Sequence, residues 1–223
     1  MKVKICCIKS VKEAMTAIRH GATALGLVGP MPSGPGPIGL DLISRISADI
    51  PAHIDSFYLT SKTSFDDIVS EYELAQTSHI QLTDHVEESV RIKLKNTYPE
   101  LKIVQVIHVQ DGSSLNQAMS YAESSDALLL DSGSPTNSLK TLGGTGKTHD
   151  WRISAEIVKS LSIPVYLAGG LKASNVLEAV ERVRPHGIDL CSSVRTNDIM
   201  DEHKIARFFK VLRENDLLNK SFA

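Results

Sequence analysis

The sequence alternates short runs of β-branched and apolar residues with amphipathic stretches, and it does so eight times. The runs typical of strands occupy residues 2–8, 23–28, 52–59, 79–83, 101–109, 126–131, 164–168 and 187–191. The stretches with helical periodicity occupy residues 10–20, 39–48, 64–76, 87–97, 114–124, 152–161, 173–183 and 201–214. Such alternation predicts right-handed βαβ units and a parallel sheet. Eight units in 223 residues favour a (β/α)8 barrel, the TIM-barrel fold, over residues 1–223 as a single domain. An open doubly wound sheet is the alternative.

Composition argues against several other classes of protein. The formal net charge is −2, so the chain has no basic excess with which to neutralise a nucleic acid. The sequence holds no apolar run of the ~18 residues that a membrane span needs. Residues 1–8 are too short and too charged for a signal peptide and are more typical of a strand. The three cysteines, Cys6, Cys7 and Cys191, suit a reducing compartment, so we expect a cytoplasmic protein.

Two connections that follow predicted strands are unusually long, at residues 29–38 and 132–150. Long loops in compact domains usually carry function, and in a barrel the loops that follow strands line the active-site face. Residues 146–148 read Gly-Lys-Thr, but position 141 is threonine where a nucleotide P-loop needs glycine, so that reading is rejected. We expect instead a glycine-rich lid that includes Gly144 and Lys147, with a plain surface loop as the alternative.

Alternation along the strands predicts which side chains face the barrel lumen. Burying Lys4 against the surrounding helices would be costly, so Lys4 and Cys6 are expected to point inward and Cys7 outward. The same alternation assigns six polar side chains to one lumen: Lys4, Cys6, Gln81, Asp131, Asp189 and Cys191. Each of them could be only a structural hydrogen-bond partner. Barrel interiors are usually filled with branched apolar residues, so the whole cluster predicts a site.

The ends of the last two strands predict an anion site. Gly169 and Gly170 follow the seventh strand, and Ser192 and Ser193 follow the eighth. The corresponding loops of barrels frequently bind phosphate through backbone N–H groups, although simple turns are the alternative. The eight histidines form no pair at metal-ligand spacing with a supporting carboxylate, and no Cys-x-x-Cys is present. We therefore expect neither a metal nor another cofactor.

Several motifs together resemble the phosphoribosylanthranilate isomerase family over nearly the whole chain. They are KIC at 4–6, GATALGLV at 21–28, LLLDS at 128–132, GGTGKTHDW at 143–151, PVYLAGGL at 164–171, Asn175-Val176 and GIDLCSSVR at 187–195. The resemblance implies an Amadori rearrangement in tryptophan biosynthesis, in which an aminoaldose phosphate becomes an aminoketose. It implies that Cys6 is the general base and Asp131 the general acid. It also implies a substrate phosphate near Gly169, Gly170, Ser192 and Ser193.

The chain departs from the family pattern in five respects. Cys-Gly becomes Cys6-Cys7, and Gln-Leu-His-Gly becomes residues 81–84, Gln-Leu-Thr-Asp. The Ser-Gly of the phosphate loop becomes Ser192-Ser193, and a following glutamate becomes Arg195. The family has Ser-x-Arg in the second loop, where the arginine grips the anthranilate carboxylate, whereas residues 33–36 here read Ser-Gly-Pro-Gly. Losing a bidentate contact of this kind would weaken substrate binding.

These departures leave three functions open. The first is phosphoribosylanthranilate isomerase activity, with Arg195 or Lys147 in place of the missing arginine and with Lys4, Gln81 and Asp189 as further contacts. The second is a related isomerase of a different phosphorylated aminosugar. The third is a barrel that binds a sugar phosphate without turnover. The expected partner is a phosphorylated small molecule, with no nucleic acid and no membrane, and the chain could act as a monomer or a homodimer.

Overall fold

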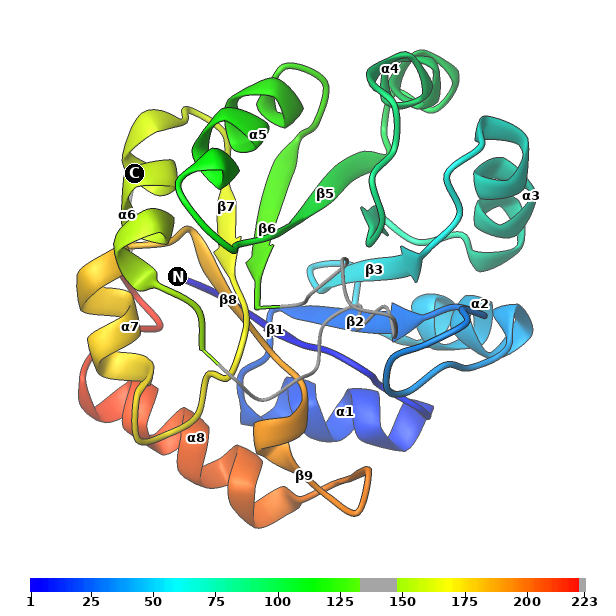
Figure 1. Cartoon of the computed structure of the whole chain (residues 1–223). Helices are drawn as coiled ribbons and strands as arrows, with labels where there is room; N and C mark the ends of the chain where they lie inside the picture. Colours follow the sequence, from blue (N-terminus) through cyan, green and yellow to red (C-terminus); the bar gives the residue numbers. More distant parts are fainter. Residues whose placement is uncertain (133–147, 221–223) are drawn as a thin grey trace.

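In the computed structural model, which describes residues 1–132 and 148–220, eight parallel strands close into a barrel inside a ring of helices (Figure 1). The strands pair in chain order, and β8 closes on β1. They are β1 (Lys2–Ile5), β2 (Ala24–Val28), β3 (Asp55–Thr60), β4 (His79–Leu82), β5 (Lys102–His108), β6 (Ala127–Asp131), β7 (Val165–Leu167) and β8 (Gly187–Leu190). The barrel prediction is thus confirmed, and the open sheet is wrong.

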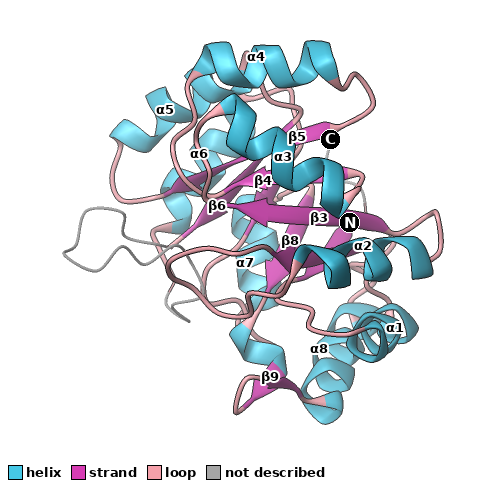
Figure 2. Cartoon of the chain, turned by 90° about the vertical axis from the view of Figure 1, so that its right-hand side faces the viewer, coloured by secondary structure: helices cyan, strands magenta, loops and turns pink. Residues whose placement is uncertain are grey.

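Among residues 1–132 and 148–220, eight helices surround the strands (Figure 2). They are α1 (Val11–His20), α2 (Leu40–Asp49), α3 (Phe65–Ala75), α4 (Glu88–Thr97), α5 (Ser113–Ala122), α6 (Trp151–Ser160), α7 (Val176–Val183) and α8 (Glu202–Glu214). Ser10 and Ser64 cap α1 and α3 by accepting hydrogen bonds from the backbone N–H groups of Glu13 and Asp67. In the described part of the chain, no helix combines the length and the apolar character that crossing a membrane requires.

A short insertion between β8 and α8 was not predicted from the sequence. It consists of a 3₁₀ turn, η1 (Ser192–Val194), and a hairpin of β9 (Arg195–Thr196) and β10 (Ile199–Met200). The hairpin turn places Asn197 and Asp198 at φ 50° and 62°, the left-handed pair that a type I′ turn needs. Strands of two residues have no measurable periodicity, which is why the sequence pattern missed them.

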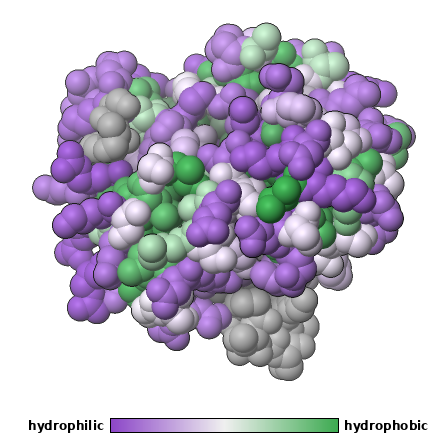
Figure 3. Space-filling view, turned by 90° about the horizontal axis from the view of Figure 1, so that it is seen from above, coloured by the Kyte–Doolittle hydropathy of each residue, from purple (hydrophilic) through white to green (hydrophobic). Residues whose placement is uncertain are grey.

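The surface on the α4 and α5 side of the molecule is largely hydrophilic, with apolar residues in separate groups (Figure 3). The large apolar side chains that the described residues expose come from five different elements. They are Leu74 of α3, Ile92 of α4, Met119 of α5, Leu177 of α7 and Ile199 of β10. The apolar exposure is therefore dispersed over the elements of the fold.

The strands separate two cores. Leu128 and Leu130 of β6 and Leu190 of β8 belong to the outer core between barrel and helices. Leu129 belongs to the inner core, which fills the lumen together with residues such as Phe57 and Tyr166. A side-chain period of two residues produces this division, and it turns Asp131 and Asp189 toward the lumen.

A buried lysine occupies the lumen of the barrel. Lys4 is 0% exposed, its Nζ lies 3.0 Å from Oδ2 of Asp189, and it also sits 5.3 Å from the centre of the Phe57 ring. Gly26 on β2 makes room for it, because a Cβ atom at residue 26 would lie 3.0 Å from Lys4 Nζ and 2.7 Å from Cys6 Sγ. The lysine and the first cysteine therefore depend on the same glycine for space.

Replacing Gly26 with alanine is expected to lower the free energy of unfolding by about 1–3 kcal/mol, because the added methyl overpacks the lumen. Gly39→Ala is the matched control, because a Cβ atom there meets nothing within 4 Å. Urea denaturation of both variants measures the difference. Equal stabilities would contradict the tight packing inferred around residue 26.

Candidate active site

A cavity opens at the carboxyl ends of the barrel strands. Most of the residues predicted as site residues line it: Cys6, Gln81, Asp131, Gly169, Gly170, Asp189, Ser192 and Ser193. Lys4 is fully buried beside Asp189. Gly144 and Lys147 lie outside the described residues. Groups from β1, β4, β6, β7 and β8 thus face one space although the chain separates them widely.

Cys6 lies just beyond the end of β1 and is only 6% exposed. A hydrogen bond from the thiol of Cys7 lowers the pKa of Cys6 to about 6, and the nearby charge of Lys4 works in the same direction against the effect of burial. Burial by itself would lower the pKa of Lys4, but Asp189 and Cys6 outweigh it and hold that pKa above its usual range. Cys6 is therefore a thiolate at neutral pH, the form in which a cysteine acts as a base or nucleophile.

Asp189 differs from an ordinary surface carboxyl. Burial raises the pKa of Asp189 to about 8, against the opposing effect of Lys4. Lys4, whose Nζ lies 3.0 Å from Oδ2 of Asp189, favours the ionised carboxylate with which it forms an ion pair. Lys4 thus faces two acidic groups, the Asp189 carboxyl and the Cys6 thiol, and its positive charge favours the ionised form of both.

Asp131 is the last residue of β6 and reaches the same cavity, with 9% of its surface exposed. Its Oδ1 accepts a hydrogen bond of 2.7 Å from the backbone N–H of Ser132. Within the sheet its direct neighbour on β5 is His108. A carboxyl group and a thiolate thus face one space from different strands, as a reaction that needs one acid and one base requires.

The loops after β7 and β8 line the part of the cavity between the end of β6 and the end of β1. Gly169 and Gly170 adopt φ 83° and 64°, and a Cβ atom at residue 169 would lie 2.9 Å from Ser132 Oγ. The backbone carbonyl of Gly170 accepts a hydrogen bond of 3.0 Å from Asn175 Nδ2, which fixes the loop. The Oγ of Ser193 is buried with no hydrogen-bond partner among the described atoms. Exposed backbone and an unpaired hydroxyl suit an anion at this end.

Comparison with known proteins agrees with this geometry. A sequence model of the family described as N-(5'phosphoribosyl)anthranilate (PRA) isomerase matches residues 3–211. The chain belongs to this family. An N-(5'-phosphoribosyl)anthranilate isomerase of Crocosphaera subtropica is 35% identical over 217 residues, 96% of this chain and 99% of that protein. The second such isomerase of Methanosarcina mazei is 33% identical over 93% of this chain and 92% of its own length.

Solved structures of the family share the fold. Phosphoribosyl anthranilate isomerase from Thermotoga maritima superposes with a TM-score of 0.81 at 25% identity, covering 96% of this chain and 99% of that one. The enzyme from Pyrococcus furiosus superposes with a TM-score of 0.79 at 26% identity over 96% and 99%. The family resemblance and the barrel prediction are both confirmed.

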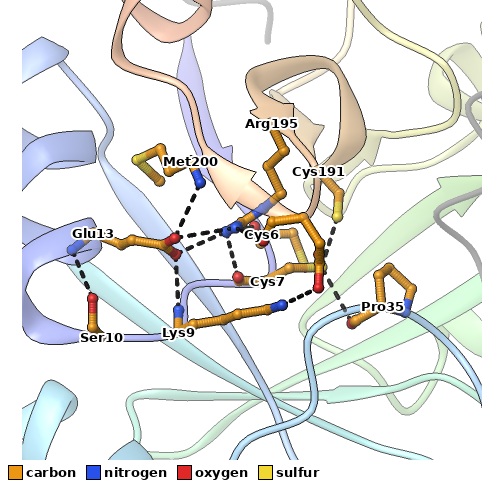
Figure 4. A network of polar contacts seen from close by, with 10 residues as sticks. Cys6, Cys7, Lys9, Ser10, Glu13, Pro35, Cys191, Arg195 and Met200 are labelled. Carbon is orange, nitrogen blue, oxygen red and sulfur yellow. Dashed lines mark hydrogen bonds and ion pairs between the residues drawn. The ribbon is translucent and has the colours of Figure 1, made fainter.

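The placement of Cys7 corrects a prediction. The strand ends at Ile5, and Cys7 takes the left-handed conformation at φ 63°, so its side chain turns into the cavity instead of packing outward. Its Sγ lies 2.7 Å from Cys191 Sγ and 3.5 Å from the carbonyl oxygen of Pro35 (Figure 4). Extending the alternation to residue 8 caused the error. A left-handed φ is natural for the glycine that the family has here.

Arg195 also differs from its predicted role. It is 5% exposed, and its guanidinium donates hydrogen bonds to both carboxylate oxygens of Glu13, at 3.2 and 3.0 Å, and to the carbonyl of Cys7 (Figure 4). The same glutamate accepts from the backbone N–H groups of Lys9 and Met200. Arg195 therefore ties the turn after β1 to the β9–β10 hairpin, and the prediction that it replaces the missing arginine is wrong.

Sequence reasoning missed His108, which ends β5 and lines the cavity. The signal was present. Alternation along residues 102–109 puts Val104, Val106 and His108 on the inner face, and the first two belong to the inner core. A polar residue at the carboxyl end of an inward-facing row is a candidate for the mouth of the barrel.

Replacing Cys7 with glycine is expected to raise the pKa of Cys6 from about 6 toward the ordinary ~8.5, because the hydrogen bond from Cys7 is lost. Thiolate absorbance near 240 nm, followed against pH, measures the shift. Cys7→Ser is the matched control, since a hydroxyl can still donate to Cys6 and a smaller rise is expected. If the pKa of Cys6 is the same in the glycine variant as in the wild type, Lys4 and not Cys7 is the main cause of the lowered pKa.

Proposed function

We propose that this protein catalyses the Amadori rearrangement of N-(5'-phosphoribosyl)anthranilate to the corresponding aminoketose, 1-(2-carboxyphenylamino)-1-deoxyribulose 5-phosphate, in tryptophan biosynthesis. One observation carries the proposal. In a chain of the phosphoribosylanthranilate isomerase family, a thiol of lowered pKa and a carboxyl group line the same cavity from β1 and β6. The three free cysteines fit a cytosolic location, where disulfides are rare.

The chemistry assigns one role to each reacting group. Asp131 is the general acid: it donates a proton to the ring oxygen of the furanose, and the ring opens to an iminium. The Cys6 thiolate then removes the proton from C2′, and the resulting enol rearranges to the ketone. Each step is an acid–base transfer by a positioned side chain, which contributes roughly 10²–10⁴-fold to a rate. The phosphate would be held at the ends of β7 and β8 by four residues: Gly169, Gly170, Ser192 and Ser193.

The thiolate requirement predicts a pH dependence. Because the folded-state pKa of Cys6 is lowered to about 6, the base is present above that pH and is lost as the pH falls through it. We expect kcat/KM to fall tenfold per pH unit below about 6. The pH–rate profile, measured with saturating and with limiting substrate, tests this expectation. An acidic limb with an apparent pKa near the ordinary ~8.5 would contradict the proposed thiolate form of Cys6.

The function is tested with the purified protein and N-(5'-phosphoribosyl)anthranilate made in situ, following loss of anthranilate fluorescence. Complementation of a tryptophan auxotroph that lacks this isomerase is the second measurement. Turnover and growth are expected, and absence of both overturns the proposal.

A second candidate is an isomerase of a different phosphorylated aminosugar. It is favoured by residues 33–36, where Gly34 and Pro35 line the cavity without any charge. Turnover of other N-substituted phosphoribosylamines, with none of the anthranilate derivative, would support it.

A further inference from the structure

His108 has an unusual environment for a histidine. Its Nε2 lies 3.2 Å from the backbone carbonyl of Thr83, an acceptor, so Nε2 carries a proton. Its Nδ1 is buried and has no hydrogen-bond partner among the described atoms. A buried polar atom without a partner is costly, and in a ligand cavity it is a candidate for a ligand contact. His108 is in register with Asp131 of the neighbouring strand, and both residues line the cavity.

The charges of the side chains around the cavity indicate which kind of ligand group His108 could bind. Lys4 is held by Asp189 at 3.0 Å, and Arg195 is held by Glu13 at 3.0 Å. The described residues that line the cavity from the loop after β2 are Met31, Gly34 and Pro35, none of which carries charge. Of all the lining residues that the structure describes, His108 is the one side chain that can become positive.

The order of the strands around the barrel indicates which part of the substrate could reach His108. The anion end of the cavity lies at β7 and β8, and the reacting groups lie at β1 and β6. Thr83 and His108 lie at the ends of β4 and β5, on the other side of Asp131 from β7. A substrate with its phosphate at β7 and β8 and its ring beside Asp131 would extend its aromatic group toward His108.

We propose that His108 binds the carboxylate of the substrate's aromatic group through Nδ1, in place of the arginine that residues 33–36 lack. This inference rests on the proposed function, because it takes the anthranilate derivative as substrate. A carboxylate only accepts hydrogen bonds, so Nδ1 would donate to it, and the Thr83 carbonyl fixes the ring so that this nitrogen is the one available. Recognition of the aromatic group has thus moved from the loop after β2 to the end of β5.

The experiment compares two substrates, N-(5'-phosphoribosyl)anthranilate and N-(5'-phosphoribosyl)aniline, which lacks the carboxylate. His108→Phe keeps a ring of similar size and removes both nitrogens. With the anthranilate derivative we expect kcat/KM to fall by about tenfold to a hundredfold, mainly through KM, as for loss of a charged hydrogen bond. With the aniline derivative, the variant and the wild type should agree within about twofold.

Two further variants complete the test. His108→Asn retains a side-chain N–H and should recover part of the loss. His85→Phe removes an imidazole that is 60% exposed at the same rim but does not line the cavity, and it should leave both substrates unaffected. Equal losses on both substrates, no loss on either, or turnover of the aniline derivative alone would overturn the role of His108. Failure of the wild type on both substrates overturns the proposed function instead.

Discussion

Asp131→Asn and Cys6→Ser are each expected to lower kcat by at least about a thousandfold without unfolding the protein. An amide cannot deliver the proton that opens the sugar ring. A serine hydroxyl is a much weaker acid than a thiol, so it is not ionised near neutral pH and cannot act as the base in place of the Cys6 thiolate. Loss of a positioned acid or base costs up to ~10⁴-fold. Both side chains are nearly isosteric with the residues they replace, so the free energy of unfolding should change little.

The control for the carboxyl is Asp126, immediately before the start of the same strand. Its Oδ2 accepts a hydrogen bond of 2.8 Å from the backbone N–H of Ile103, and its Oδ1 pairs with Lys95 at 3.2 Å. Asp126→Asn should therefore lower stability and leave kcat unchanged, the reverse of Asp131→Asn. Steady-state kinetics and urea denaturation on the three variants separate the two effects. Retention of more than a few per cent of kcat in Asp131→Asn would remove that residue from the reaction.

Lys4→Met is expected to have the second largest effect, because it acts on both stability and activity. The substitution leaves Asp189 and the Cys6 thiolate buried without their cation. Breaking a buried ion pair costs about 3–5 kcal/mol, and we expect about 3 kcal/mol because Asp189 can take up a proton. The folded-state pKa of Lys4 lies above its ordinary value, so the stability that its bound proton contributes is lost only as the pH rises above about 10.

In the same variant, Lys4→Met, we expect the pH dependence of kcat/KM to shift, and activity to be retained at higher pH. Without the charge of Lys4 the pKa of Cys6 rises, so the acidic limb of kcat/KM should move from about 6 toward ~8.5. The double variant Lys4→Met, Asp189→Leu removes both ionisable groups and should recover most of the stability. It should not return the acidic limb to its original pH. Recovery of both properties together would show that Lys4 matters only for folding.

The sequence alone determined the barrel and the membership of its inner face. Eight repeats of a strand period followed by a helical period can close in few ways, and a period of two residues fixes which side of each strand a residue occupies. That is why Lys4, Cys6, Gln81, Asp131 and Asp189 could be assigned to one lumen before any coordinates were known.

Only the tertiary structure decided what happens where the strands end, because alternation stops being informative there. Cys7 turns inward through a left-handed backbone, and Arg195 is captured by Glu13 from a helix 182 positions away in the chain. The pairing of His108 with the carbonyl of Thr83 likewise depends on the register between β4 and β5. Periodicity is a property of neighbours along the chain, whereas hydrogen-bond partners and pKa values depend on which distant groups the closed barrel brings into contact.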